Sequence, residues 1–113
     1  MIEHIHPADL SNWLVQQRSH GTPVVLDVRE PMELALASIK PLDFELLTIP
    51  MGAIVQRLEE LDPERPIACL CHHGSRSMQV ANYLQNRGFK HVANITGGIN
   101  AWSIQLDPGI ALY

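Results

Sequence analysis

Short apolar runs alternate with amphipathic segments along most of the chain. The apolar runs predict five strands, at residues 2–5, 24–26, 44–49, 66–71 and 92–95. The run at 24–26 reads Val-Val-Leu, and a continuous apolar run is typical of a strand buried on both faces of a sheet. Strands of this kind, joined by helical crossovers, predict a mainly parallel central sheet with helices on both sides.

The segments between these runs show helical periodicity. Behind Pro7, the residues Leu10, Trp13 and Leu14 are spaced i, i+3 and i+4, and proline is favoured at the first position of a helix. Further helices are predicted at residues 31–37, at 54–61, at 78–88 and in a final short segment that carries Ala101, Trp102 and Ile104. The predicted fold class is therefore α/β, with the sheet between two helical layers.

Length and composition predict a single domain that covers residues 1–113. The 46% hydrophobic and 18% charged side chains suit one folded core. A formal net charge of −4 without a Lys/Arg cluster argues against a nucleic-acid partner. No apolar run approaches the roughly 20 residues needed to cross a bilayer, and the first residues lack the features of a signal peptide. We therefore expect a cytoplasmic protein with reduced thiols and no membrane partner.

The most informative stretch begins where the fourth apolar run ends at Cys71. A polar loop, His72-His73-Gly74-Ser75-Arg76-Ser77, follows this cysteine and leads into the amphipathic segment at 78–88. A helix N-terminus stabilises an anion, and a thiolate is the reactive form of cysteine. Cys71 is therefore the candidate nucleophile, with Arg76 as a nearby cation. Cys69 lies within the predicted strand and is expected to belong to the core.

Several loop residues are open to more than one interpretation. Gly74 relaxes the steric limits of a tight loop and lets amide N–H groups converge on an anionic sulfur. His72 and His73 either add positive potential that attracts an anionic substrate, or are exposed without a specific role. With Cys69 and Cys71 they would crowd four metal ligands into five positions, whereas structural zinc sites draw on two separated segments. We therefore predict no metal and no cofactor.

Charged residues near Cys71 have two possible roles. Arg76 either binds a substrate oxyanion with two hydrogen bonds or braces the loop against a carboxylate, and the sequence leaves both open. Asp27 and Arg29 follow the second strand, at the carboxyl end where α/β proteins place their sites. Together with Glu33 they favour an ion-pair network that supports the pocket over a direct part in catalysis.

Four motifs carry a resemblance to a known family. In order they are Asp27-Val28-Arg29-Glu30-Pro31-x-Glu33, Ile49-Pro50, Cys71-x-x-Gly74-x-Arg76-Ser77 and Gly97-Gly98-Ile99-x-Ala101-Trp102. On these motifs the chain resembles a single-domain rhodanese of the thiosulfate sulfurtransferase family. The resemblance implies a three-layer α/β/α fold around a mainly parallel five-stranded sheet. It also implies that Cys71 takes up a sulfane sulfur and passes it on, and that residues 72–77 bind the substrate.

One segment departs from the family pattern. After the glutamate the family has an aromatic residue and a Gly-His-Ile-x-Gly-Ala segment, whereas this chain has Leu34-Ala35-Leu36-Ala37-Ser38-Ile39-Lys40-Pro41. We expect the fold to be unaffected and one wall of the pocket to differ.

The leading hypothesis is therefore an enzyme that moves a sulfane sulfur from thiosulfate or a persulfide donor to a thiophilic acceptor through a Cys71 persulfide. Its partners would be a small anionic sulfur donor and, as one class of acceptor, a protein thiol. The alternatives are a sulfur-relay or protein-interaction module with little small-molecule turnover, and a Cys-dependent phosphatase or arsenate reductase. Phosphatases of that type resemble this loop but place five residues between cysteine and arginine, whereas Cys71 and Arg76 are separated by four.

Overall fold

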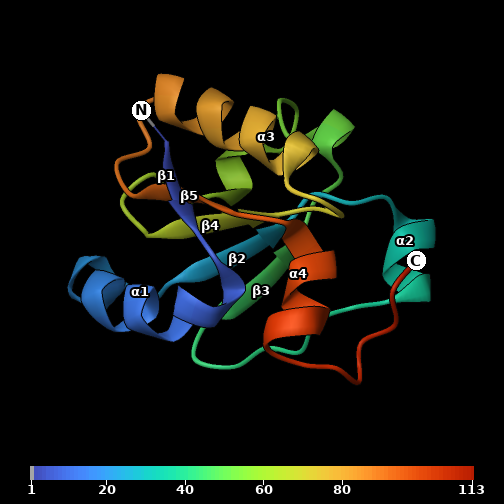
Figure 1. The fold of residues 1–113 in the computed structure, drawn as a ribbon. Helices are drawn as coiled ribbons and strands as arrows, with labels where there is room; N and C mark the ends of the chain where they lie inside the picture. The colour runs from blue at the N-terminus through green and yellow to red at the C-terminus, as the bar shows by residue number, and fades with distance from the viewer. Residues whose placement is uncertain (1) are drawn as a thin grey trace.

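The computed structural model describes residues 2–113, and its centre is one five-stranded sheet (Figure 1). The strands are β1 (Glu3–Ile5), β2 (Val24–Asp27), β3 (Glu45–Thr48), β4 (Ile67–Leu70) and β5 (Val92–Ile95). They lie in the order β1-β5-β4-β2-β3, and each neighbouring pair is parallel. The predicted α/β fold with a five-stranded parallel sheet is confirmed.

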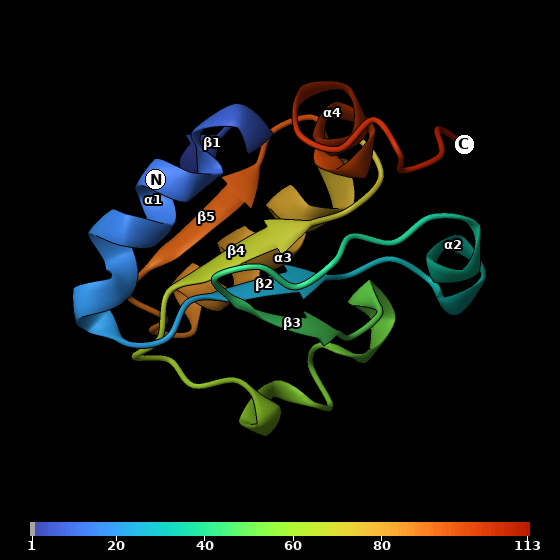
Figure 2. The same ribbon diagram turned by 90° about the horizontal axis from the view of Figure 1, so that it is seen from below.

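Helices form a layer on each side of this sheet, which completes the three-layer arrangement. One layer contains α1 (Leu10–Gln17) and α4 (Gly98–Gln105), and the other contains α3 (Ser75–Asn86). The shorter α2 (Pro31–Leu36) lies beyond the carboxyl ends of the strands (Figure 2). Within residues 2–113, the structure has no helix that is both long and apolar enough to span a membrane.

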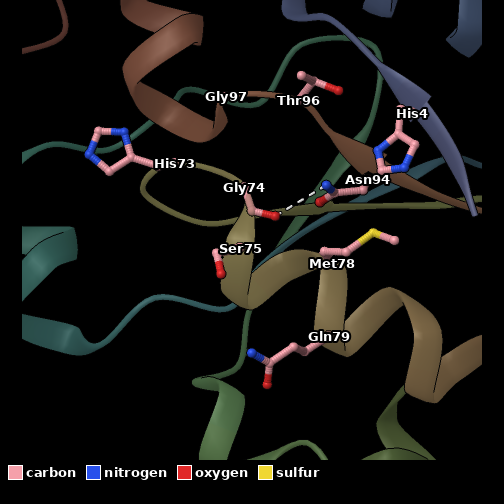
Figure 3. Close-up of a pocket in the computed structure, with 9 residues that line it drawn as sticks. All are labelled: His4, His73, Gly74, Ser75, Met78, Gln79, Asn94, Thr96 and Gly97. Atoms are coloured by element: carbon pink, nitrogen blue, oxygen red, sulfur yellow. Dashed lines mark hydrogen bonds between the residues drawn. The ribbon is translucent and has the colours of Figure 1, made fainter.

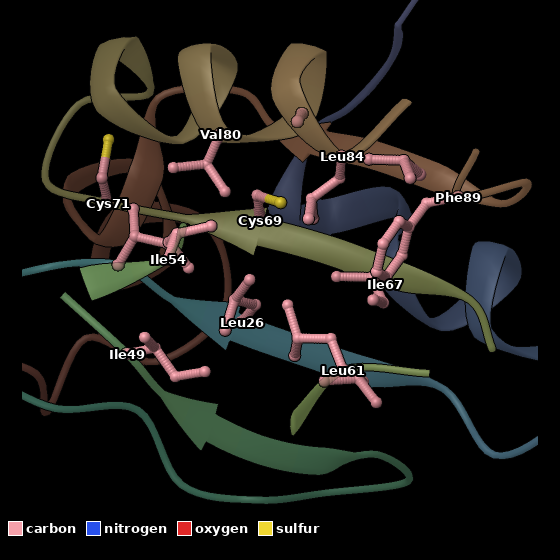
Figure 4. Close-up of a cluster of buried hydrophobic side chains, with 14 of the residues drawn as sticks. Leu26, Ile49, Ile54, Leu61, Ile67, Cys69, Cys71, Val80, Leu84 and Phe89 are labelled. Atoms are coloured by element: carbon pink, nitrogen blue, oxygen red, sulfur yellow. The ribbon is translucent and has the colours of Figure 1, made fainter. Parts of the chain in front are cut away.

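The pleat of each strand divides the buried side chains between two cores. In β4, Ile67 and Cys69 pack on the side of α3, whereas Ala68 and Leu70 pack on the side of α1 and α4. Figure 4 shows the first of these cores, with Cys71 at its end beside the loop that enters α3. Because a helical layer packs on each face of the sheet, β4 must be apolar on both faces. The apolar run at residues 66–71 predicted this strand, and β4 lies within it.

The prediction of a helix at residues 54–61 is wrong. Instead the chain makes two short 3₁₀ turns, Met51–Ala53 and Leu58–Glu60, with loose turns between them. Ile54 and Leu61 are buried, whereas Val55 is 65% exposed. Ile54 and Leu61 thus hold the two ends of the segment in the core. Because the residues between them bury little apolar surface, packing does not favour a continuous helix there.

The segment after α4 crosses the carboxyl edge of the sheet toward α2 (Figures 1 and 2). Ile110 is buried in the core beside α4, and its carbonyl oxygen accepts a hydrogen bond from the Ser103 hydroxyl at 2.6 Å. The sequence predicted a turn and an apolar tail here. These contacts fix the path of the segment and bring Tyr113 to the residues that follow β2.

Candidate active site

Cys71 directly follows β4, at the point where the chain turns into α3 (Figure 4). It shares a sheet face with Cys69, as the two-residue period of a strand requires, and it is only 1% exposed. The backbone N–H of Gly74 donates a hydrogen bond to its Sγ atom at 3.1 Å. The sulfur is therefore covered and is already held by one loop amide.

The loop after Cys71 is shorter than predicted, because α3 begins at Ser75 and not at Met78. Gly74 has φ +105°, a conformation that favours glycine, and this turn lets the helix start at once. The apolar periodicity used for the prediction begins only at Met78, since the first turn of the helix is polar. The N–H groups of this first turn have no intrahelical acceptor and lie at the positive end of the helix.

A second helix N-terminus holds the same loop from the other side. The backbone N–H groups of Ile99 and Asn100 in α4 donate to the carbonyl oxygens of Cys71 and His72, at 2.8 Å and 3.2 Å. At Gly98, which has φ +60°, a side-chain carbon would lie about 2.5 Å from the His72 carbonyl oxygen. The glycine is therefore required for this close backbone contact.

Asn94 on β5 holds the loop through two side-chain hydrogen bonds. It was not identified as a site residue from the sequence. Its side chain accepts a hydrogen bond from the Ser77 hydroxyl at 2.5 Å and donates one to the Gly74 carbonyl at 3.2 Å. Ser77 is fully buried, so its hydroxyl faces Asn94 and not the solvent. A polar residue inside an otherwise apolar buried strand was the one signal in the sequence that pointed to this contact.

Arg76 braces the loop against a carboxylate, which is one of its two predicted roles, and its contact with a substrate oxyanion stays a prediction. Its guanidinium makes two hydrogen bonds to Glu33 of α2, at 2.7 Å and 2.8 Å. These bonds, with the backbone N–H of Glu30, lower the pKa of Glu33 from 4.5 to about 2 and raise that of Arg76. Glu33 therefore ties α2 to the start of α3.

Asp27 and Arg29 form a buried ion pair at the end of β2. Their side chains are almost fully buried, and the shortest N–O distance between them is 2.8 Å. Burial disfavours the charged guanidinium, but hydrogen bonds to Asp27 and Tyr113 outweigh this and raise the pKa of Arg29. The predicted network exists, although Glu33 pairs with Arg76 and offers Arg29 only its backbone oxygen, at 3.3 Å.

The two loop histidines belong to a stack of three rings. The His72 ring lies 3.9 Å from that of His73 and 3.8 Å from that of Tyr113, to which it is nearly parallel. Burial and the neighbouring His73 lower the pKa of His72 from 6.5, which disfavours its charged form. The role of His72 in attracting an anionic substrate stays a prediction. Nothing in the sequence pointed to Tyr113, because its contacts join segments far apart in the chain.

Cys69 differs from Cys71 in its place in the strand, although both side chains are buried. It is fully buried within β4, and burial together with the neighbouring Cys71 raises its pKa to about 12. A thiol in this setting stays protonated and has no access to a substrate. This agrees with its predicted place in the core.

A hollow of about 440 Å³ lies beside the loop, on the side of β1 and β5 (Figure 3). Its lining includes His73, Gly74 and Ser75 from the loop and α3, His4 from β1 and Thr96 from the turn after β5. His73 and Ser75 are exposed, so these two loop residues face solvent. Within residues 2–113, no three His, Cys, Asp or Glu side chains are placed to hold a metal ion.

Comparisons with known proteins agree on one family. The model of the rhodanese-like domain matches residues 10–105. A protein named "Sulfurtransferase" from Allochromatium vinosum is 32% identical over 111 residues, which is 98% of this chain and 97% of that protein. The rhodanese-like/PpiC domain-containing protein 12, chloroplastic, of Arabidopsis thaliana is 45% identical over 91 residues, 79% of this chain but only 30% of the plant protein. The crystal structure of a rhodanese-related protein from Thermoplasma volcanium superimposes with a TM-score of 0.77 at 29% identity, covering 98% of this chain and 99% of that one.

Replacing Gly98 tests the close backbone contact. We expect Gly98→Ala to lower the free energy of unfolding by about 2–4 kcal/mol, because the new methyl group meets two carbonyl oxygens and the left-handed conformation is strained. The control is Gly52→Ala, where a side-chain carbon meets nothing within 4 Å. Urea unfolding followed by circular dichroism measures both, and equal stability of the two variants would contradict the packing described here.

Replacing Glu33 tests the brace through its pH dependence. Because the folded protein holds the pKa of Glu33 at about 2, its stabilising effect is complete above the ordinary value of 4.5 and is lost as the pH falls toward 2. We expect Glu33→Gln to lower the free energy of unfolding by about 1–3 kcal/mol at pH 7, and by progressively less between pH 4.5 and pH 2. Urea unfolding at several pH values measures the difference.

The control for this variant is Glu60→Gln, which removes an exposed ion pair with Arg57 and should change stability little. A Glu33→Gln deficit that did not shrink with acid would show that the carboxylate charge is not what holds the loop.

Proposed function

Because the chain belongs to the family of rhodanese-like domains, we propose that it is a sulfurtransferase that carries a sulfane sulfur as a persulfide on Cys71. A relative matched over nearly its whole length bears the name sulfurtransferase. The donor would be a small anionic sulfur donor, either thiosulfate or a persulfide, and the acceptor cyanide or a thiol, including a protein thiol. We further propose that residues 1–113 act as one domain, in the cytoplasm and without a metal or cofactor.

The hydrogen bond from the Gly74 amide to the Cys71 sulfur is the observation that carries this proposal. The donor is 3.1 Å from Sγ, at the entrance to α3, where further amides of the first turn have no intrahelical acceptor. Such amides stabilise a thiolate, and they would stabilise a terminal persulfide anion in the same way that an oxyanion hole stabilises a developing charge. No side-chain base is then needed.

The reaction balances without an added oxidant. The Cys71 thiolate attacks the outer sulfur of thiosulfate and forms a new S–S bond, while the S–S bond of thiosulfate breaks and its electron pair leaves with sulfite. An acceptor such as cyanide then attacks the outer sulfur of the persulfide. Thiocyanate leaves, and the electron pair of the broken bond returns to Cys71 as thiolate. In this scheme Arg76, occupied by Glu33, orients the loop, and residues 72–75 receive the donor.

The same loop argues against phosphoryl transfer. Four residues separate Cys71 from Arg76, one fewer than in the Cys-dependent phosphatases that this loop resembles. A phosphoryl group needs donors around its three equatorial oxygens. Here the guanidinium already binds the Glu33 carboxylate with two hydrogen bonds, so it is not free to bind phosphate in that way.

Intact-mass spectrometry after incubation with thiosulfate tests the proposal. We expect wild type and Cys69→Ala to gain one sulfur atom, since Cys69 lies buried within the strand, and Cys71→Ser to gain none. Subsequent addition of cyanide should remove the added sulfur and yield thiocyanate. Persulfide on Cys69, or no sulfur on the wild-type protein with any small donor, would overturn the assignment.

A further inference from the structure

Tyr113 contacts both groups of charged residues around the active-site loop. Its hydroxyl lies 3.0 Å from Nη1 of Arg29 and 3.0 Å from Oε1 of Glu33. Its ring stacks on His72, with the ring planes 7° from parallel. One side chain thus links the ion pair at the end of β2 to the glutamate that holds Arg76.

The direction of these hydrogen bonds follows from the chemistry of the groups. Arg29 has donors and no acceptor, so the Tyr113 hydroxyl must accept from it. The single hydroxyl proton is then donated to Glu33, which is ionised at neutral pH. Burial raises the pKa of Tyr113 above 10.0, so this proton stays in place. The result is one ordered chain of bonds from Asp27 to Arg76.

The ring of Tyr113 adds a second link to the loop. The centroid of the His72 ring lies 3.8 Å from that of Tyr113 and 3.9 Å from that of His73, which is tilted by 30°. The stacked Tyr113 ring and the tilted His73 ring therefore both restrict the orientation of the residue next to Cys71.

The segment that carries Tyr113 is itself well held. Ile110 is buried and bonded to Ser103, and the turn before it is closed by a hydrogen bond from the Ile110 N–H to the carbonyl of Asp107 at 3.0 Å. Tyr113 packs against the core that contains Ile110. Because α4, which precedes this segment, also binds the carbonyls of Cys71 and His72, the segment and the loop share one support.

We propose that Tyr113 is a positioning residue that latches the active-site loop over Cys71, acting through Glu33 and His72. The proposal rests on Cys71 being the reactive residue of the function proposed above. It adds the regulation of that site: the latch keeps the sulfur covered and the loop amides aligned.

This role predicts two effects of opposite sign. In the latched loop Cys71 is 1% exposed, so a looser loop exposes the thiol to reagents more often. The same loosening misaligns the amides that stabilise the persulfide and slows sulfur uptake. A residue in direct contact with the donor would, when replaced, leave thiol exposure unchanged.

The test compares Tyr113→Phe, which keeps the ring and removes the hydroxyl, with Tyr83→Phe, the same change at the only other tyrosine, on α3. Two rates are measured: alkylation of Cys71 by iodoacetamide, and sulfur uptake from thiosulfate. For Tyr113→Phe we expect alkylation about three- to tenfold faster and uptake slower by a similar factor, the range expected for loss of one hydrogen bond. Tyr83→Phe should change both by less than twofold.

A double variant tests whether Tyr113 acts on the loop through Glu33. If Tyr113 acts through Glu33, adding Tyr113→Phe to Glu33→Gln should change alkylation by less than twofold. If the two substitutions change the alkylation rate independently, so that their effects multiply, the proposal is overturned. It is also overturned if folded Tyr113→Phe is alkylated at the same rate as wild type or more slowly. The alkylation rates do not depend on sulfur transfer. They therefore decide on the latch even if wild type takes up no sulfur, an outcome that would instead contradict the proposed function.

Discussion

The candidate site depends on one close backbone contact, between the N-terminus of α4 and the carbonyl groups of Cys71 and His72. The contact is possible because Gly98 has no side chain and takes a left-handed conformation. It turns these carbonyls toward α4, while the amide of Gly74 faces the sulfur on the side of α3. Two helix N-termini thus act on the same short loop, one binding its carbonyl groups and the other presenting amides to the sulfur.

The charged residues around the loop form ion pairs with one another that hold the loop in this conformation. Arg76 is engaged by Glu33, and the hydrogen bonds that Glu33 accepts keep its pKa at about 2. Arg29 is engaged by Asp27 within the buried layer behind them. The cations of the site are therefore paired with protein carboxylates, and the hydrogen bond that the Cys71 sulfur accepts comes from the backbone amide of Gly74. This division suits a small anionic group on Cys71 more than a phosphoryl group that needs an arginine clamp.

The sequence was most informative where local pattern and burial agree. Residues 67–70 form the predicted strand, since a parallel strand buried on both faces favours a continuous apolar run. The pattern at 54–61 misled because apolar anchors at its two ends do not require a helix between them. The partner of Arg76 and the contacts of Tyr113 depend on residues distant in the chain, so no local pattern contains them.

We propose that backbone amides of the loop, and not side chains, stabilise the persulfide anion on Cys71. Amide ¹H–¹⁵N NMR spectra recorded before and after conversion of Cys71 to its persulfide test it most directly, because an anion accepting a hydrogen bond shifts the donating amide. The account predicts that the largest shifts fall on residues 73–77, with Gly74 prominent among them. Persulfidation that left these amides unshifted, while side-chain signals of Arg76 moved, would contradict it.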